Sequence, residues 1–341
     1  MYFHNVIGQD DLKARLTDTA RRGIIPHARL FCGRTGSGTF PLALAYARYL
    51  NCSDRTDTDA CGKCHSCRQY DALAHPDLHF VFPIVADKKR KRTVCDDYLG
   101  EWREMLTEHT YFDLDEWLDR METAGKQALI YAEESDQMIR KTSLRIYEAQ
   151  YRVLIVWMPE RMHAACANKL LKLIEEPPAH TVILMVSDAP DLILGTILSR
   201  TQRLDVRPIE ADALAHASYT PVMDGDADPG EVVWTWVPYQ EDASVGKDRP
   251  VVVIGADGPG VYVVQLTSKD HGLDAEQEAR NGRFWLDIGS GAWDPKGRPS
   301  QVRLDRALWV LSTDVRREGA VLPRATWQRV VDAIDRHHRA H

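Results

Sequence analysis

The arrangement of hydrophobic and polar positions changes near residue 215 of this chain. Before that point, apolar runs typical of buried strands alternate with amphipathic stretches typical of helices. The strand-like runs are 30–32, 153–157 and 182–187, and the helix-like stretches include 41–50 and 164–174. Alternation of this kind predicts a parallel sheet with covering helices, that is, an α/β domain.

After residue 216 the pattern is typical of a small β-rich domain. Residues 219–230 are rich in Asp, Gly and Pro, which predicts an irregular linker. A final helix is expected over 324–336. We therefore predict domains at 1–212 and 230–341, joined by a linker over 213–229. The β-type runs of the second domain are 231–234, 251–254, 261–264 and 302–304, with a hairpin signal at Asp257-Gly258.

Composition narrows the class of protein without identifying it. A chain of 341 residues with 44% hydrophobic and 27% charged residues is typical of a soluble protein of about two domains. The net charge of −7 excludes a general attraction to nucleic acid, so any such contact needs a local basic patch. Residues 1–10 lack the features of a secretion signal, and no apolar run approaches the ~20 residues of a membrane helix. We expect a cytoplasmic protein with no membrane partner.

Four of the seven cysteines are spaced like the ligands of a metal. Thiolates in a C-x8-C-x2-C-x2-C pattern can close a tetrahedral Zn²⁺ site, and a chain without a secretion signal favours metal over disulfides. The alternative is that some of them are ordinary buried thiols. Cys32, Cys95 and Cys166 lack partners at such spacing and are expected in the core. The predicted ligands are Cys52, Cys61, Cys64 and Cys67.

A degenerate phosphate-binding loop precedes these cysteines. Residues 33–40 keep the glycines of such a loop, including Gly33 and Gly38. A working loop follows its last glycine with Lys, which reaches the β/γ-phosphates, and then Ser or Thr, which binds Mg²⁺. Here those positions hold Thr39 and Phe40. The strand at 153–157 ends in Trp-Met instead of an acidic pair, so we predict no bound nucleotide cofactor and no ATP hydrolysis.

Three further segments agree with the cysteines and the loop. They read F-H-N-V-I-G-Q at 3–9, N-K-L-L-K-L-I-E-E-P-P at 168–178 and T-I-L-S-R-T-Q at 196–202. Together these motifs resemble the δ′ subunit family of the bacterial DNA polymerase III clamp loader, over about residues 1–212. The resemblance implies an AAA+ fold with a zinc insertion and a role in DNA replication. It also implies clamp-loader ATPase subunits and DNA polymerase III as partners, with indirect contact to DNA.

The resemblance assigns a role to Arg200. In the family, the Arg of this Ser-Arg motif is an arginine finger, offered in trans to the nucleotide of a neighbouring subunit. A guanidinium is always charged and binds phosphate oxygens in pairs, which suits this role. The alternative is an ordinary surface Arg. The resemblance ends at about residues 207–209, where the family normally continues into a helical lid and a collar that holds a pentamer together.

The second half carries a different resemblance. G-E-V-V-W at 230–234, R-P-V-V-V at 249–253 and V-V-Q-L-T-S at 263–268 follow one another in order. As a set they resemble the PemK/MazF family of toxin endoribonucleases, over about residues 220–336. The resemblance implies a small SH3-like β-barrel, single-stranded RNA as substrate, an antitoxin partner and a homodimer formed through the barrel.

The PemK/MazF resemblance places the catalytic pair at Arg249 and Thr267. Such enzymes cut RNA without metal and use the ribose 2′-OH as nucleophile. Arg249 is then expected to stabilise the phosphorane and assist proton transfer, while Thr267 holds a phosphate oxygen. The alternative for Arg249 is a strand-start residue that pairs with Asp248 or Glu231. The tryptophans of this half either stack on bases or form core and dimer contacts; they include Trp234, Trp236, Trp285 and Trp293.

Two functions follow from the two halves. In the first, the chain is a δ′-like clamp-loader subunit that hydrolyses no ATP, supplies Arg200 to a neighbour and carries an appended PemK/MazF-like domain. In the second, it is a metal-independent endoribonuclease whose first half is a docking module. A chimera whose halves act independently is a further alternative.

Overall fold

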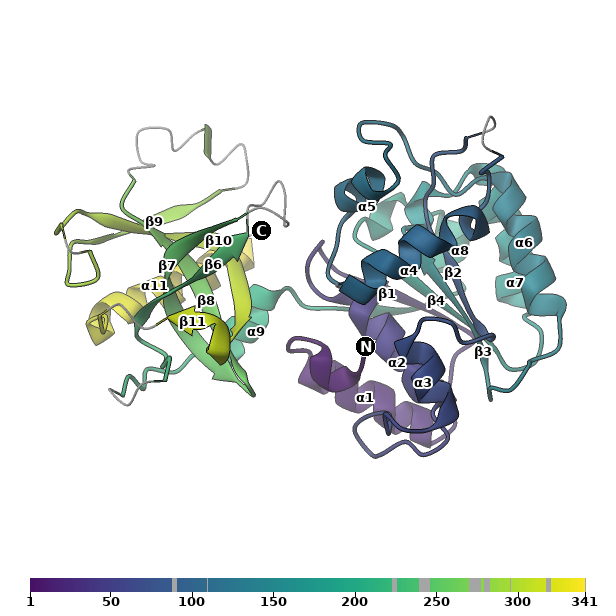
Figure 1. The fold of residues 1–341 in the computed structure, drawn as a ribbon, viewed down its shortest axis with the longest axis horizontal. Helices are drawn as coiled ribbons and strands as arrows, with labels where there is room; N and C mark the ends of the chain where they lie inside the picture. The colour runs from purple at the N-terminus through teal and green to yellow at the C-terminus, as the bar shows by residue number, and fades with distance from the viewer. Residues whose placement is uncertain are drawn as a thin grey trace. The chain divides into compact units, whose positions relative to one another are not determined.

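The chain forms two compact units, Met1–Pro208 and Ile209–His341, each with a sheet of its own (Figure 1). We call them unit 1 and unit 2. Within the described part of the chain, no helix combines the length and apolar character that a membrane crossing requires. The computed structural model describes residues 1–87, 91–108, 110–222, 226–238, 246–269, 277–278, 283–294, 296–316 and 320–340.

Unit 1 contains a parallel sheet of five strands in the order β2-β3-β4-β1-β5. The side chains of β1, β3 and β4 are buried along their whole length, as expected for strands covered on both faces. This arrangement confirms the predicted α/β domain. The strands are β1 (Ala28–Cys32), β2 (Leu78–Val81), β3 (Arg152–Trp157), β4 (Thr181–Ser187) and β5 (Gln202–Asp205).

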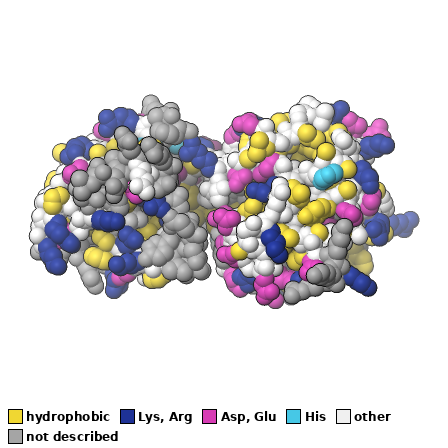
Figure 2. Space-filling model, turned by 90° about the horizontal axis from the view of Figure 1, so that it is seen from above, with side chains coloured by type: hydrophobic (Ala, Val, Ile, Leu, Met, Phe, Trp, Pro, Cys, Tyr) yellow, Lys and Arg dark blue, Asp and Glu magenta, His cyan; other side chains and the backbone are white. Residues whose placement is uncertain are grey.

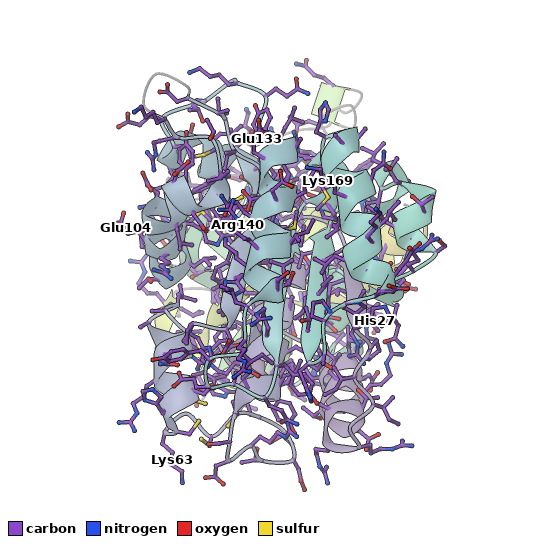
Figure 3. All side chains as sticks on the ribbon, turned by 90° about the vertical axis from the view of Figure 1, so that its right-hand side faces the viewer. His27, Lys63, Glu104, Glu133, Arg140 and Lys169 are labelled. Carbon is purple, nitrogen blue, oxygen red and sulfur yellow. The ribbon has the colours of Figure 1, made fainter. Side chains whose placement is uncertain are left out.

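Helices pack on this sheet through apolar stripes at helical spacing. In α7 the buried residues Cys166, Leu170 and Leu173 recur along one face, whereas Lys169 lies on the outer face (Figure 3). All three cysteines predicted in the core are buried. The helices are α1 (Asp10–Arg21), α2 (Thr39–Asn51), α3 (His65–Asp71), α4 (Leu99–Glu108), α5 (Leu114–Arg120), α6 (Ala132–Ser143), α7 (Ala164–Glu175) and α8 (Gly195–Leu198), with short 3-10 turns η1 (Phe3–Asn5), η2 (Cys95–Tyr98), η3 (Pro159–Arg161) and η4 (Pro190–Leu192).

Unit 2 is built on an antiparallel sheet in the order β11-β6-β7-β8-β10-β9. The predicted β-rich domain with a terminal helix is therefore confirmed. Among the described strands, no pairing joins the edge strands β11 and β9 to close the sheet. The SH3-like barrel therefore stays a prediction. The elements are α9 (Ile209–Ala215), β6 (Val232–Pro238), β7 (Gly246–Asp257), β8 (Gly260–Thr267), β9 (Trp285–Gly289), β10 (Ser300–Leu311), η5 (Ser312–Asp314), β11 (Val315–Arg316) and α11 (Arg324–Ala340).

Valines of β6, β7 and β8 form one apolar core of unit 2, with Val233, Val251 and Val263 fully buried. The helix α11 packs Trp327 against the sheet, and its indole N–H donates to the carbonyl of Val253 at 3.1 Å. Because successive residues of a strand point to opposite faces, these strands can pack side chains on both faces of the sheet.

The segment predicted as a linker lies within unit 2. The N–H of Ser218 donates to the carbonyl of Ile254 at 3.3 Å, and the hydroxyl of Tyr219 donates to the carbonyl of Leu322 at 2.6 Å. Contacts divide the chain at Pro208, before α9. The composition of this stretch predicts irregular backbone, which does not exclude packing against a sheet; Met223, Asp224 and Gly225 lie outside the described residues.

Candidate functional site

The four predicted metal ligands come together beside the start of α3. Their Sγ atoms lie within 4.8 Å of one another. Backbone N–H groups within the cluster donate to these sulfurs: Cys61 to Cys52 at 3.2 Å, Cys64 to Cys61 at 3.4 Å and Cys67 to Cys64 at 3.4 Å. Four thiols in this arrangement can hold a metal such as zinc.

The surroundings of the cluster shift the pKa values of its thiols in different directions. Burial raises the pKa of Cys52 and Cys67. Burial also acts on Cys64, but hydrogen bonds from the backbone of Cys67 and Ser53 lower the pKa of this thiol to about 6. Amide donors favour the thiolate form that binds metal, and binding then releases the protons of the remaining thiols.

Buried polar contacts attach the cysteine cluster to the rest of unit 1. The guanidinium of Arg48, 1% exposed, pairs with Asp71 and donates to the carbonyl of Cys67 at 3.3 Å. The same guanidinium lies 3.9 Å from the centre of the Tyr2 ring. The carboxylate of Asp59 accepts the N–H of Phe3 at 3.1 Å. The cluster therefore joins the N-terminal segment to α2 and α3.

Aromatic side chains lie against the segment predicted as a degenerate phosphate-binding loop. Gly38 has the left-handed backbone (φ +84°) that places α2 behind the loop. Phe40, 4% exposed, packs edge-on against Phe112 with ring centres 5.0 Å apart. A Cβ at Gly38 would lie 3.1 Å from the hydroxyl of Tyr111. The cavity that remains between these side chains has a volume of about 30 Å³.

The end of β3 shows the same replacement of charge by apolar surface. Trp157 is 7% exposed and packs against Phe112 at 5.0 Å. The nearby carboxyl of Glu160 accepts the hydroxyl of Ser187 at 2.8 Å, and burial raises the pKa of Glu160 to about 7. Burial therefore favours the neutral form of this carboxyl.

Arg200 lies just after α8, and its guanidinium is oriented by neighbouring groups. Its Nε lies 2.6 Å from Oε1 of Glu175 in an ion pair, and its Nη1 donates to the carbonyl of Thr196 at 2.9 Å. The Arg200 side chain is 38% exposed. Glu175 is the last residue of α7, so the E-E-P-P segment both ends that helix and contacts Arg200.

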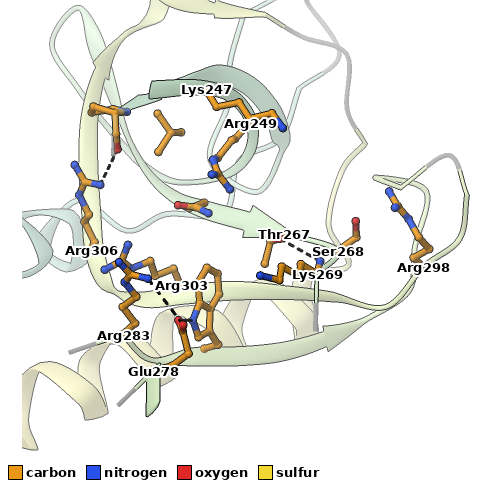
Figure 4. Close-up of a pocket in the computed structure, with 14 residues that line it drawn as sticks. Lys247, Arg249, Thr267, Ser268, Lys269, Glu278, Arg283, Arg298, Arg303 and Arg306 are labelled. Carbon is orange, nitrogen blue, oxygen red and sulfur yellow. Dashed lines mark hydrogen bonds and ion pairs between the residues drawn. The ribbon is translucent and has the colours of Figure 1, made fainter. Parts of the chain in front are cut away.

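Unit 2 contains a pocket of about 600 Å³ at the edges of its central strands (Figure 4). Arg249 of β7 and Thr267 of β8 both line it, and these strands pair with Val251 opposite Gln265. The N–H of Lys269 donates to the hydroxyl of Thr267 at 3.1 Å. The structure therefore brings the two predicted residues into one cavity.

The pocket in unit 2 is strongly basic. Among the lining residues that the structure describes, the single acidic one is Glu278, which accepts the indole N–H of Trp285 at 3.0 Å. Lys and Arg side chains are also spread over the face of unit 2 that Figure 2 turns to the reader. The basic residues of the pocket are Lys247, Arg249, Lys269, Arg283, Arg298, Arg303 and Arg306.

Comparisons with known proteins decide the family. A family model described as "DNA polymerase III, delta subunit" matches residues 8–210. The chain belongs to this family. A second model, described as a PemK-like, MazF-like toxin of type II toxin–antitoxin systems, matches residues 228–338 of this delta-family chain.

Relatives of the delta-family half are similar to it at moderate identity. The chain is 27% identical to DNA polymerase III subunit delta′ of Bacillus subtilis (strain 168), over 58% of this chain and 47% of the relative. It is 28% identical to subunit gamma/tau of Mycobacterium tuberculosis (strain ATCC 25618 / H37Rv), over 60% of this chain and 28% of the relative. The chain therefore spans less than half the length of these curated relatives. The solved Mycobacterium tuberculosis toxin MazF-mt6 is 18% identical, with a TM-score of 0.21 over 30% of this chain and 93% of that one.

Sequence reasoning missed several residues of these delta-family and toxin-like sites. Glu175 is distant in sequence from Arg200, and no spacing rule connects them. Tyr111 and Phe112 reach the phosphate loop from the segment before α5. Arg303 and Arg306 lie on β10, and Arg283 and Arg298 lie in segments before it. Only their shared approach to one pocket identifies them as members of the site.

The structure also shows where the residues named in the alternative predictions for unit 2 lie. Asp248 forms its ion pair with Arg316, and Glu231 accepts the N–H of Asp228 at 3.3 Å. Of the tryptophans, Trp285 lines the basic pocket. Trp234 and the buried Trp293 line an adjoining cavity of about 390 Å³, whereas Trp236 is 55% exposed.

Proposed function

We propose that this chain is a clamp-loader subunit with an AAA+ fold that hydrolyses no ATP and presents Arg200 to the nucleotide of a neighbouring ATPase subunit. One observation supports this most: aromatic side chains fill the phosphate cradle, while Arg200 stays exposed and oriented. Its partners are then the clamp-loader ATPase subunits and DNA polymerase III, with DNA contacted indirectly.

The geometry of Arg200 suits a contact in trans. In the described part of the protein, Nε forms an ion pair with Glu175 and Nη1 donates to the carbonyl of Thr196, whereas Nη2 has no partner. A guanidinium with donors left over can bind oxygens of a phosphoryl group and stabilise the charge that develops during transfer. Glu175 holds the other edge of the group, so the arginine loses less conformational freedom when it binds.

An ATPase assay with the purified chain and a gamma/tau-type subunit of the same organism tests this function. The chain alone is expected to show no turnover and no binding of ATP at millimolar concentration, because the cradle is filled. Added to the partner subunit, it is expected to stimulate hydrolysis. Turnover by the chain alone, or no stimulation of the partner, would contradict the proposal.

We propose zinc as the metal of the cysteine cluster, in a structural role. Four thiolates form a closed site without an open position for substrate, which is typical of structural zinc. The purified chain is expected to contain about one equivalent of zinc. Its removal by a chelator is expected to lower the midpoint of thermal unfolding of unit 1 on the order of 10 °C, since a structural site contributes several kcal/mol.

Variants of the cysteine loop make the zinc prediction specific. Cys61→Ser is expected to lose zinc and to show no further shift on chelation. Lys63→Ala, in the same loop but with its side chain 79% exposed (Figure 3), is expected to keep the metal and the midpoint. Less than about half an equivalent of zinc in the wild type, or an equal loss in the Lys63 variant, would count against the site.

We propose a second function for unit 2, cleavage of single-stranded RNA without metal. The observation that favours it is the position of Arg249 and Thr267 in a pocket with six other basic residues. The ribose 2′-oxygen would attack the adjacent phosphorus, the bond to the 5′-oxygen would break, and the products would be a cyclic phosphate and a 5′-hydroxyl. Arg249 would stabilise the phosphorane and Thr267 would donate to one of its oxygens. An antitoxin and a second copy of the chain are the proposed protein partners of unit 2.

A further inference from the structure

A second cavity of unit 2, of about 390 Å³, adjoins the basic pocket. Arg249 and Thr267 line both cavities, so the predicted catalytic pair lies where the two meet. The second cavity differs in chemistry, because two indole rings and two apolar side chains contribute to its wall. We call it the indole cavity. Besides the pair, its lining includes Trp234, Pro250, Leu266, Trp293 and Asp294.

The turn that carries Trp293 and Asp294 is held by its own backbone. The N–H of Asp294 donates to the carbonyl of Gly291 at 3.2 Å, and the N–H of Gly297 donates to the carbonyl of Asp294 at 2.9 Å. Trp293 is buried against Gly291, where a Cβ would lie 2.0 Å from Cζ3 of the indole. A glycine at position 291 therefore leaves room for the ring, and the turn fixes this wall of the cavity.

Asp294 places a buried carboxylate at the indole cavity. Its Oδ1 accepts the N–H of Lys296 at 2.8 Å, and its Oδ2 accepts Nε of Arg298 at 2.9 Å. Arg298 lies on the Ser268 side of the basic pocket (Figure 4). The hydrogen bond from Lys296, followed by the one from Arg298, lowers the pKa of Asp294, so the group is ionised. An ionised carboxylate only accepts hydrogen bonds, and each of its oxygens has a second lone pair to offer.

We propose that the indole cavity binds the base next to the cleaved phosphate and selects guanine through Asp294. This inference rests on the proposed ribonuclease function. A volume of about 390 Å³ is at the lower end of the ~300–1,000 Å³ of ligand pockets, which suits one nucleoside. A substrate whose phosphate contacts Arg249 and Thr267 brings an adjacent base to this cavity. The faces of Trp234 and Trp293 offer the apolar surface on which bases stack.

The donors and acceptors on the edges of the four bases favour guanine. Guanine presents two adjacent donors, N1–H and the 2-amino group, which one carboxylate accepts in two parallel hydrogen bonds. Adenine and cytosine present an amino group beside an acceptor nitrogen, and uracil presents one N–H between two carbonyls. In these three bases an acceptor faces the second oxygen of the carboxylate. Hydrogen bonds to a charged acceptor are stronger than neutral ones, so the two bonds to guanine discriminate well.

Binding of short uncleavable ligands tests the proposal. The probes are 2′-O-methyl dinucleotides in which one position is uracil and the other is each of the four bases, in both orders. At one of the two positions, we expect guanine to bind the full chain on the order of tenfold more tightly than uracil. Hypoxanthine, which is guanine without the 2-amino group, is expected to lose most of this gain. Asp294→Asn is expected to remove the gain while changing the affinity for the diuridine probe by less than about threefold.

Matched variants make the outcome decisive. Asp332→Asn removes an exposed carboxylate of α11 that lines neither cavity, and it is expected to keep the guanine preference. Trp234→Ala is expected to weaken binding of every base at that position. Trp236→Ala, two residues along β6, removes an exposed indole outside both cavities and is expected to have no effect.

The comparison of guanine with hypoxanthine uses the wild-type chain, so the proposal stays testable even if the Asn variant does not fold. Equal binding of the four bases at both positions would overturn the guanine site. Equal binding of guanine and hypoxanthine, or a guanine preference that persists in Asp294→Asn, would do the same.

The binding assay also separates this inference from the ribonuclease function. The 2′-O-methyl group blocks the nucleophile, so the base preference is measured without cleavage. If the wild type leaves RNA intact but prefers guanine through Asp294, the base site stands and the ribonuclease does not. If RNA is cut and the probes show no base preference, the ribonuclease stands and the guanine site is wrong.

Discussion

The variant Arg200→Ala is expected to lower the kcat of ATP hydrolysis by roughly 10³-fold at the nucleotide site that Arg200 faces, with a smaller change in KM. The reason is electrostatic. An arginine supplied in trans stabilises charge that develops only in the transition state, so its loss affects the chemical step more than binding. A mixture of this chain with one ATPase subunit of the clamp loader is the simplest assembly in which to measure it.

A nearby arginine provides the matched control for Arg200. Arg203 of β5 is 53% exposed at its side chain and pairs with Asp205 at 2.7 Å. Arg203→Ala removes the same charge from the same unit and is expected to leave kcat within about twofold. Equal activities of the wild-type and Arg200→Ala assemblies would show that the arginine-finger role is wrong. Loss of activity in both variants would instead point to impaired binding of the partner subunit.

The second large effect is expected at Arg249. Arg249→Ala should reduce cleavage of a defined single-stranded RNA in EDTA by about 10³-fold, because the residue stabilises the phosphorane directly. Thr267→Val removes a single neutral hydrogen bond and should reduce the rate by about tenfold. The comparison separates the two roles that we propose for these residues.

Controls on the same RNA assay decide whether unit 2 is a ribonuclease. Arg329→Ala, on the exposed face of α11, is expected to cut RNA at the wild-type rate. Wild-type cleavage that disappears in EDTA would show that the proposed metal-independent mechanism is wrong. RNA left intact by the wild type would leave the clamp-loader function as the remaining proposal for this chain.

Local features of the sequence predicted much of this structure. The alternation of apolar runs and amphipathic stretches predicted the parallel sheet of unit 1, since each strand is buried and each helix has one apolar face. The cysteine cluster was also predictable, because three of its members lie within a few residues of one another, and a short loop brings such residues together in almost any fold. The absence of the phosphate-binding Lys and of the Mg²⁺-binding hydroxyl from the loop is visible in two residues, Thr39 and Phe40.

Other features depend on contacts between distant segments. The packing of the stretch after α9 on β7 and α11 could not be predicted, because its composition indicates only irregular backbone. The aromatic filling of the phosphate cradle needs Tyr111 and Phe112 to lie over Gly38, far from the loop in sequence. Nothing in the spacing of the chain indicates that approach.

The sequence by itself determined which candidate groups each half carries: four clustered thiols, an arginine in a Ser-Arg motif, and an Arg/Thr pair on two strand-like runs. Only the tertiary structure decided what surrounds each group. Glu175 orients Arg200, and β10 adds Arg303 and Arg306 to the pocket of Arg249. The physical reason is that a motif is defined by neighbours along the chain, whereas charge and room at a site depend on side chains that folding brings from elsewhere.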